Sequence, residues 1–199
     1  MPSSNNIGII ILAAGSSSRL GEPKQLLQYD HKTLLQNTID AAVNSNASHV
    51  ILVLGANAEE ISNEINKSNT HVLINKEWRE GMASSIRNGL NELLFISPLT
   101  AAVIIMVCDQ PHLSCDVINE MISMYHQTGK KIVACNYGEK IGPPALFHNN
   151  FFDELMRLQG DVGARKIIQQ NENEMITVPF VKGKIDIDTK EDYDALKNS

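Results

Sequence analysis

The sequence predicts an α/β fold, a three-layer, doubly wound and mostly parallel sheet with a short antiparallel insertion. Apolar runs of strand length alternate with segments that carry apolar residues at helical spacing, which is typical of a parallel sheet covered by helices on both faces. After residue 137 a Gly-Pro-Pro turn precedes a short apolar run, and this change predicts an antiparallel or edge strand. The chain has 199 residues, 43% of them hydrophobic, which is enough for the single domain that we expect over residues 1–199.

The elements follow from the periodicity of the apolar residues. Unbroken, β-branched runs such as Ile7 to Leu12 read as buried parallel strands. Leu35, Ile39 and Ala42 share one face of a helix, and Ile86, Leu90 and Leu93 share one face of another that is expected to start near Ser84. The strands expected in order are 7–12, 49–54, 70–74, 101–107, 132–136, 142–148, 175–178 and 185–188. Helices are expected between and after these strands. The first two end near residues 44 and 65, the third begins near 84, and the fourth spans 114–128. A fifth spans 151–156, a sixth begins near 162, and the last follows Thr189.

Composition limits the class of protein. A net charge of −6 and a pI near 5.5 argue against a nucleic-acid binder or a membrane-surface binder, which would carry a basic stripe. Cys108, Cys115 and Cys135 form no CxxC pair and are odd in number, so we expect neither a disulfide framework nor a zinc site. The opening residues 1–6 lack the features of an export signal, and no stretch is long enough to span a bilayer. A reducing, cytoplasmic location is therefore expected.

The stretch from Leu12 to Lys24 follows directly on the first strand, and open α/β sheets bind ligands at the carboxyl ends of their strands. The small residues from Ala13 to Ser18 allow the backbone to approach an anion closely, and Arg19 and Lys24 add two cations. The stretch matches neither a Walker loop nor a dinucleotide fingerprint. It predicts a cradle for a nucleotide triphosphate, with a Ser/Gly-rich surface loop as the alternative.

Two carboxylates are candidate magnesium ligands. Asp109 ends the most apolar strand, where an acidic side chain is costly unless it is hydrogen-bonded or bound to a cation. Asp186 and Asp188 fall on one face of the short strand expected over 185–188. Asp188 can also shield the start of the terminal helix, so we expect Asp109 and Asp186 to hold Mg²⁺, and the choice between Asp186 and Asp188 stays open.

The string from Leu12 to Lys24, continuing into Gln25-Leu26-Leu27, resembles the signature of the MobA-like nucleotidyltransferases. Ala13-Ala14-Gly15 is similar to the molybdenum cofactor cytidylyltransferase branch of that family. The resemblance implies a Rossmann-like nucleotidyltransferase fold and covers nearly the whole chain. The further segments that match, in family order, are Gly81–Ser85, Asp109–Pro111, Gly142–Phe147, Gly160–Arg165 and Asp186–Tyr193.

The resemblance also implies roles for residues. It assigns catalysis to Arg19, Lys24 and Asp109. It assigns nucleotide binding to Leu12, Ala13, Ala14, Gly15, Ser16, Arg19, Lys24, Gly81, Ser84 and Ser85. It assigns the second substrate, the acceptor, to Gly142, Pro144, Asp161, Gly163 and Arg165. The chain departs from the family pattern at Pro143, where a His or Asn is common, and at Lys190, where Pro is usual.

The activity that the resemblance implies is Mg²⁺-dependent transfer of CMP from CTP to the phosphate of molybdopterin, with release of pyrophosphate. No general base is needed, because a phosphate nucleophile is already ionised at pH 7. A molybdoenzyme or its maturation chaperone is a possible partner. Three alternatives stay open: a guanylyltransferase or another acceptor, an NAD(P)H-dependent reductase, and a chaperone that only carries the molybdenum cofactor.

Overall fold

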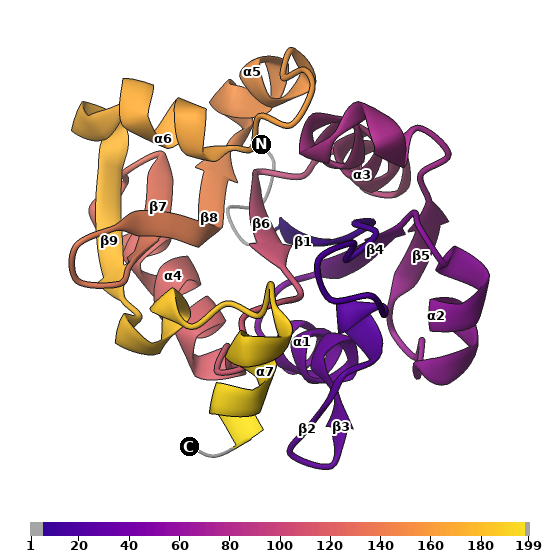
Figure 1. The fold of residues 1–199 in the computed structure, drawn as a ribbon. Coiled ribbons are helices and arrows are strands. Elements are labelled where there is room, and N and C mark those ends of the chain that lie inside the picture. The colour runs from indigo at the N-terminus through magenta and orange to yellow at the C-terminus, as the bar shows by residue number, and fades with distance from the viewer. Residues whose placement is uncertain (1–5, 198–199) are drawn as a thin grey trace.

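A seven-stranded sheet organises the computed structural model, which describes residues 6–197 (Figure 1). The strand order is β5-β4-β1-β6-β8-β7-β9. The strands are β1 (Ile7–Ala13), β4 (His49–Leu54), β5 (His71–Ile74), β6 (Ala102–Val107), β7 (Ile132–Asn136), β8 (Ile141–His148) and β9 (Met175–Pro179). Every pairing is parallel except those of β8 with β6 and β7. The predicted mostly parallel α/β fold is therefore confirmed.

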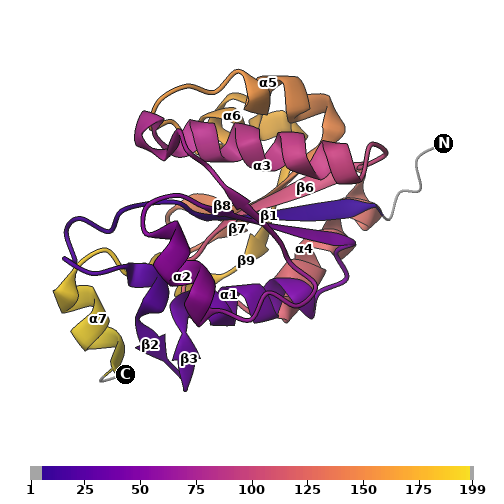
Figure 2. The same cartoon turned by 90° about the vertical axis from the view of Figure 1, so that its right-hand side faces the viewer.

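Helices cover both faces of this sheet (Figure 2). One layer holds α3 (Met82–Ile96), α5 (Phe152–Met156) and α6 (Arg165–Gln170), and the other holds α1 (Leu34–Val43), α2 (Ala58–Glu64) and α4 (Cys115–Thr128). Alternate residues of β1 supply the two apolar cores: Ile9 and Ile11 pack in the core that contains α1 and α4, and Ile10 and Leu12 pack in the core that contains α3. The continuous apolar run of β1 follows from this burial on both faces.

Helix α3 lies unusually close to β1. A Cβ atom at Gly89 would come within 2.6 Å of Ile10 Cγ2, so only a glycine permits this approach. Because α3 runs along β1 at this short distance, its first turn is held at the carboxyl end of the sheet. The helix begins at Met82, one half-turn earlier than expected, so Ser84 and Ser85 lie inside the first turn.

Two antiparallel parts of the structure differ from the prediction, one in its position in the sheet and one because it was not predicted. The segment with the Gly-Pro-Pro turn is antiparallel as expected, but it lies in the interior of the sheet between β6 and β7 and is not an edge strand. A separate hairpin, β2 (Gln28–Tyr29) and β3 (Lys32–Thr33), was not predicted. Its turn residues Asp30 and His31 both have positive φ, of 51° and 65°, without the Asn-Gly pair that usually marks such turns.

The expected strand over residues 185–188 does not form. This segment is irregular, and its link to the sheet is the hydrogen bond that Ile187 N–H donates to the carbonyl oxygen of Asp109, 3.0 Å away. The Ile187 side chain is fully buried with Leu27 and Leu34 in a small core that also holds helix α7 (Lys190–Lys197). The alternation of Ile and Asp over residues 185–188 therefore reflects the burial of Ile187 and does not indicate a strand.

The terminal helix α7 starts as its sequence predicts. Asp192 Oδ2 accepts a hydrogen bond from Thr189 N–H at 2.8 Å, and Thr189 Oγ1 accepts one from Asp192 N–H at 3.2 Å, the reciprocal pattern of a capping box. No helix within residues 6–197 has the length and apolar character needed to cross a membrane. Met1 to Asn5, on which the expectation about an export signal partly rested, lie outside the described residues.

Candidate active site

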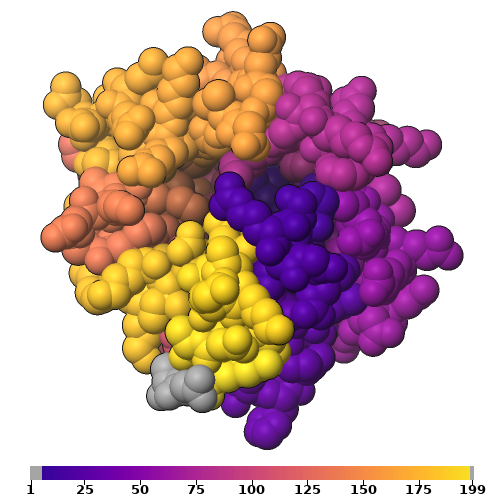
Figure 3. Space-filling model, in the orientation of Figure 1, coloured from indigo at the N-terminus to yellow at the C-terminus, as the bar shows by residue number. Residues whose placement is uncertain are grey.

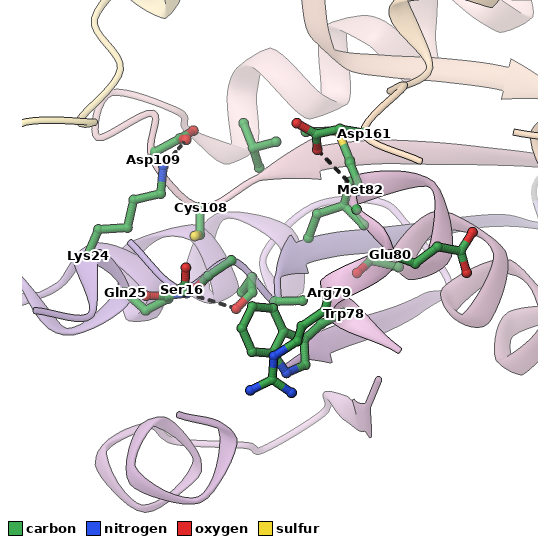
Figure 4. A pocket seen from close by; sticks show the side chains of 17 residues that line it. Ser16, Lys24, Gln25, Trp78, Arg79, Glu80, Met82, Cys108, Asp109 and Asp161 are labelled. Carbon is green, nitrogen blue, oxygen red and sulfur yellow. Dashed lines mark hydrogen bonds and ion pairs between the residues drawn. The ribbon is translucent and has the colours of Figure 1, made fainter. Parts of the chain in front are cut away.

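A cavity of about 470 Å³ opens at the carboxyl ends of β1 and β6 (Figure 4). Its walls come from the loop after β1, the ends of β6, the short turn before α3 and the first turn of α3. Figure 4 shows Lys24 and Asp109 pointing toward each other on one side of the cavity, with Asp161 beside Met82 on the other side. The volume lies in the range of pockets that bury a small organic ligand.

The loop after β1 is held by a buried glutamine. Gln25 is 1% exposed, and its Nε2 donates to the carbonyl oxygens of Ala13 at 2.9 Å and Gly15 at 3.0 Å. The carbonyl oxygen of Ala14 accepts the backbone N–H of Ala56 at 3.0 Å. Three successive oxygens therefore have partners in the protein, which reduces their repulsion of an anion in the loop. A Cβ at Gly15 would meet no atom within 4 Å, so this side of the loop is open.

Both cations expected at the site lie beside carboxylates, and Lys24 pairs with Asp109 and with Asp188 rather than with Asp186. Lys24 Nζ lies 2.6 Å from Asp109 Oδ2 and 2.9 Å from Asp188 Oδ1. Arg19 Nη1 is 3.9 Å from Asp188 Oδ2, with most of the arginine side chain exposed. Residues from the two ends of the chain thus form one charged cluster. In the space-filling view the N-terminal and C-terminal segments lie side by side on this face (Figure 3).

Charge and burial shift the pKa values in this cluster. Burial opposes the charge on Lys24, but the carboxylate of Asp109 and the hydrogen bonds to both aspartates raise its pKa above the ordinary value, so the ammonium is permanent. The pKa of Asp186 is raised, first by burial and then by the charge of Asp109. Burial and Asp109 raise the pKa of the Cys108 thiol to about 12, so this cysteine beside the cavity stays protonated.

The residues fit a single hard divalent cation that takes most of its ligands from a bound phosphate and water. Within residues 6–197 no group of three or more His, Cys, Asp and Glu side chains is arranged to hold a metal ion. Mg²⁺, however, usually binds to proteins through one or two carboxylates together with substrate phosphates. Asp109 and Asp188, which share Lys24, supply two such carboxylates.

A second cavity of about 250 Å³ adjoins the first. The two share Leu12, Met82 and Val107 in their linings, and the second is bordered by aliphatic side chains together with Arg165. Among the residues expected to bind the acceptor, Gly163 and Arg165 line this cavity and Asp161 lines the first. Gly142 and Pro144 line neither cavity, and the neighbouring Pro143 takes a place in the second.

Asp161 has a local structural role that the sequence did not predict. The helix expected to begin near residue 162 starts at Arg165, as α6, so Asp161 lies before it. Asp161 Oδ1 instead accepts the backbone N–H of Met82 at 3.4 Å, at the start of α3. The carbonyl oxygen of Gly160 accepts the N–H of Ala83 at 3.1 Å. The loop over residues 160–161 therefore satisfies two of the free N–H groups in the first turn of α3.

The structure places the expected nucleotide-binding residues unevenly. The group that lines the first cavity is Leu12, Ala13, Ala14, Gly15, Ser16, Lys24, Gly81 and Ser85. Arg19 stands outside it beside Asp188, and Ser84 is fully buried, with its hydroxyl bonded to the carbonyl oxygens of Glu77 and Gly81. Ser84 was expected to contact the nucleotide directly, and this expectation is corrected. Its buried hydroxyl instead supports the turn before α3.

Sequence reasoning missed several residues at this site. Gln25 could have been suspected, because an amide that directly follows Lys24 in a strand-proximal loop is suited to hold backbone carbonyls. Trp78 and Met82 line the first cavity, and nothing in their spacing marks them as lining residues. Asn75 is 2% exposed and bonds Ser84 and Ser85, a role that only the fold shows.

A cradle after the first strand, a permanent cation between two carboxylates and a three-layer α/β sheet define a protein that binds nucleotide phosphates. Comparison with family models agrees: the model described as "MobA-like NTP transferase domain" matches residues 9–175. The chain belongs to the MobA-like NTP transferase family.

Three curated relatives have different activities in their names. Nicotine blue oxidoreductase of Paenarthrobacter nicotinovorans is 29% identical over 81% of this chain and 80% of the relative. Purine catabolism protein PucB of Bacillus subtilis is 25% identical over 96% and 95%. Molybdenum cofactor cytidylyltransferase of Escherichia coli is 24% identical over 96% and 95%.

Solved structures extend the comparison. Rv0371c from Mycobacterium tuberculosis is 30% identical, with a TM-score of 0.87 over 99% of this chain and all of that chain. A complex of Rv0371c with manganese has a TM-score of 0.81 at 28% identity over 98% of this chain and 99% of that one. A relative of this fold therefore binds a divalent cation.

Proposed function

We propose that this protein transfers CMP from CTP to the phosphate of a molybdopterin-type acceptor and releases pyrophosphate. The observation that carries the proposal is the position of Lys24, between Asp109 and Asp188 at the edge of a cavity that the phosphate cradle closes on another side. Ala13-Ala14-Gly15 and the similarity to the cytidylyltransferase of E. coli support the choice of CTP and of the acceptor.

The chain's own residues would perform the positioning that such a transfer needs. The backbone around Gly15 and Ser16 holds the triphosphate, and Lys24 and Arg19 offset the charge on its oxygens. Asp109, with Asp188 or Asp186, would hold Mg²⁺ or Mn²⁺, which would neutralise charge on the phosphates. The acceptor phosphate attacks the α-phosphorus in line, a new P–O bond forms and the bond to the pyrophosphate breaks.

The test is incubation of the protein with each α-labelled NTP, Mg²⁺ or Mn²⁺, and molybdopterin, with labelled product and pyrophosphate measured together. We expect turnover with CTP above that with GTP. Lys24→Ala and Asp109→Ala should each lower turnover by roughly 10²-fold, as loss of a preorganised charged group does. Lys32→Ala is the matched control, because Lys32 forms an ion pair with Asp40 away from the cavity. Equal turnover of all four proteins would refute the site.

The similarity to nicotine blue oxidoreductase favours a second candidate function, an NAD(P)H-dependent reduction. The second cavity, with its mostly aliphatic lining, is the candidate place for the substrate of such a reaction. Binding of NADH or NADPH to the protein, with oxidation of the nicotinamide in the presence of an acceptor, would support it. A protein that binds molybdopterin and transfers no nucleotide from any NTP would instead be a carrier of the cofactor.

A further inference from the structure

Asn75 is a buried amide whose orientation is fixed by its partners. It follows β5 and is 2% exposed. Its Oδ1 accepts the backbone N–H of Glu77 at 2.9 Å and the side-chain amide of Asn88 at 3.3 Å. A backbone N–H can only donate, so the oxygen of Asn75 must face Glu77 and the nitrogen must face the other way.

Both hydrogens of Asn75 Nδ2 are therefore directed to the first turn of α3. They are donated to Ser84 Oγ at 2.8 Å and Ser85 Oγ at 3.0 Å. Ser84 uses its own hydrogen on the carbonyl oxygens of Glu77 and Gly81, which can only accept. Ser84 is thus fully bonded and faces the protein.

Ser85 is left in a different state. Its oxygen accepts from Asn75, and within residues 6–197 its hydroxyl donates no hydrogen bond in return. The residue is 3% exposed, and it lines the first cavity. Because Asn75 occupies one lone pair, the hydrogen of Ser85 points to another direction, and the ligand cavity is the space that its side chain borders.

The part of the cavity beside Ser85 suits a nucleobase more than a phosphate. Met82 and Ser85, three residues apart, share one face of α3, and both line the cavity together with Leu12. Figure 4 shows Met82 across the cavity from Lys24. An apolar wall with one fixed donor can hold a flat ring and read one atom on its edge.

We propose that Asn75 is a positioning residue that fixes the Ser85 hydroxyl as a hydrogen-bond donor toward the base, so that the cavity favours a base with an acceptor there. Cytosine presents a bare N3 as an acceptor, whereas uracil presents N3–H as a donor. A fixed donor opposite N3 therefore favours CTP over UTP. This inference rests on the proposed function and deepens it by naming how the base is selected.

The experiment measures the dissociation constants of CTP and UTP by the fluorescence of Trp78, the single tryptophan, which lines the cavity. In Asn75→Asp an oxygen replaces the nitrogen that faces Ser85, so the hydroxyl donates to residue 75 and offers its lone pairs to the base. We expect the preference for CTP over UTP to fall by about tenfold or more, since the variant loses a hydrogen bond to N3 of cytosine and leaves two acceptors facing each other. Ser85→Ala should lower the preference too, and Asn75→Asp should change it no further in the Ser85→Ala background.

Asn88→Ala is the matched control. It removes a hydrogen bond from the same network, but Glu77 N–H still fixes the amide, so the CTP/UTP ratio should stay as in the parent. If Asn75→Asp does not fold, as judged by circular dichroism, Asn75→Ala and Ser85→Ala carry the test. Variants that weaken CTP and UTP equally would overturn the positioning role. A parent protein without preference for CTP would instead refute the proposed nucleotide.

Discussion

Replacement of Gly81 by alanine is expected to disturb the contact between the start of α3, which lines the first cavity, and the loop over residues 160–161. Gly81 has φ of 116° and ψ of −176°, a region that is essentially restricted to glycine. A Cβ built there would lie 2.5 Å from the carbonyl carbon and oxygen of Gly160 and 2.6 Å from the nitrogen of Asp161. Both neighbours are backbone, so neither can yield without moving the loop.

The magnitude follows from two additive costs. A side chain in this backbone region costs about 1–3 kcal/mol, and overpacking against fixed neighbours costs about 1–3 kcal/mol more. Gly160→Ala is the matched control: Gly160 also has positive φ, of 62°, but a Cβ there meets nothing within 4 Å. Left-handed strain alone costs about 1–2 kcal/mol. We therefore expect Gly81→Ala to lose about 1–4 kcal/mol more stability than Gly160→Ala.

Urea unfolding followed by circular dichroism measures this difference, and nucleotide titration followed by Trp78 fluorescence measures its effect on the site. The Gly81→Ala protein should bind CTP more weakly, because the first turn of α3 carries Ser85 and is tied to the loop by Ala83 and Asp161. If both variants lose the same stability, the close approach of Gly81 to Gly160 does not shape the site, and the reasoning from this contact is wrong.

Three other changes test separate parts of the site. Gln25→Ala removes two hydrogen bonds to the cradle and should cost about 1–3 kcal/mol with weaker nucleotide binding, whereas Gln28→Ala on the exposed hairpin should change neither in unfolding and titration assays. Thr189→Ala removes the cap of α7 and should lower the free energy of unfolding by about 1 kcal/mol in urea. Asp186→Asn should raise the free energy of unfolding at pH 7. The pKa of Asp186 is raised in the fold, so its charge costs stability as pH rises through that value, and unfolding curves of variant and parent should converge below about pH 3.9.

The periodic elements could be predicted because their signal is local. The expected strand over residues 49–54 has the bounds of β4, and the helix over 114–128 differs from α4 by one residue. Buried β-branched runs and apolar stripes are properties of neighbouring residues, so a single sequence contains them. The predicted start of α3 was wrong because that start depends on the contact of Gly81 with the loop over residues 160–161. This loop is distant in the chain, so the local sequence does not contain the signal.

The candidate site could be predicted as a set of residues but not as an arrangement. Asp109 and Gly15 are marked by their place just after strands, and Lys24 by its positive charge in the loop that follows the first strand. The residues that support them, Gln25 and Asn75, are not marked in this way. Both act through hydrogen bonds to atoms that only the folded chain brings near. Ser84 and Ser85 are adjacent and chemically identical, and only the turn of the helix gives one to the core and the other to the cavity.

The C-terminal segment is part of the site although the family model ends before it. That model matches residues 9–175, and Asp188 lies beyond them, yet its carboxylate is 2.9 Å from Lys24 Nζ. The link is a backbone one: Ile187 N–H donates to the carbonyl oxygen of Asp109, so the chain on either side of that bond carries the two carboxylates that share one ammonium. Burial of Ile187 beside Leu27 and Leu34 stabilises this contact. Packing beneath the loop after β1 therefore helps to hold the charged groups of Lys24, Asp109 and Asp188 together.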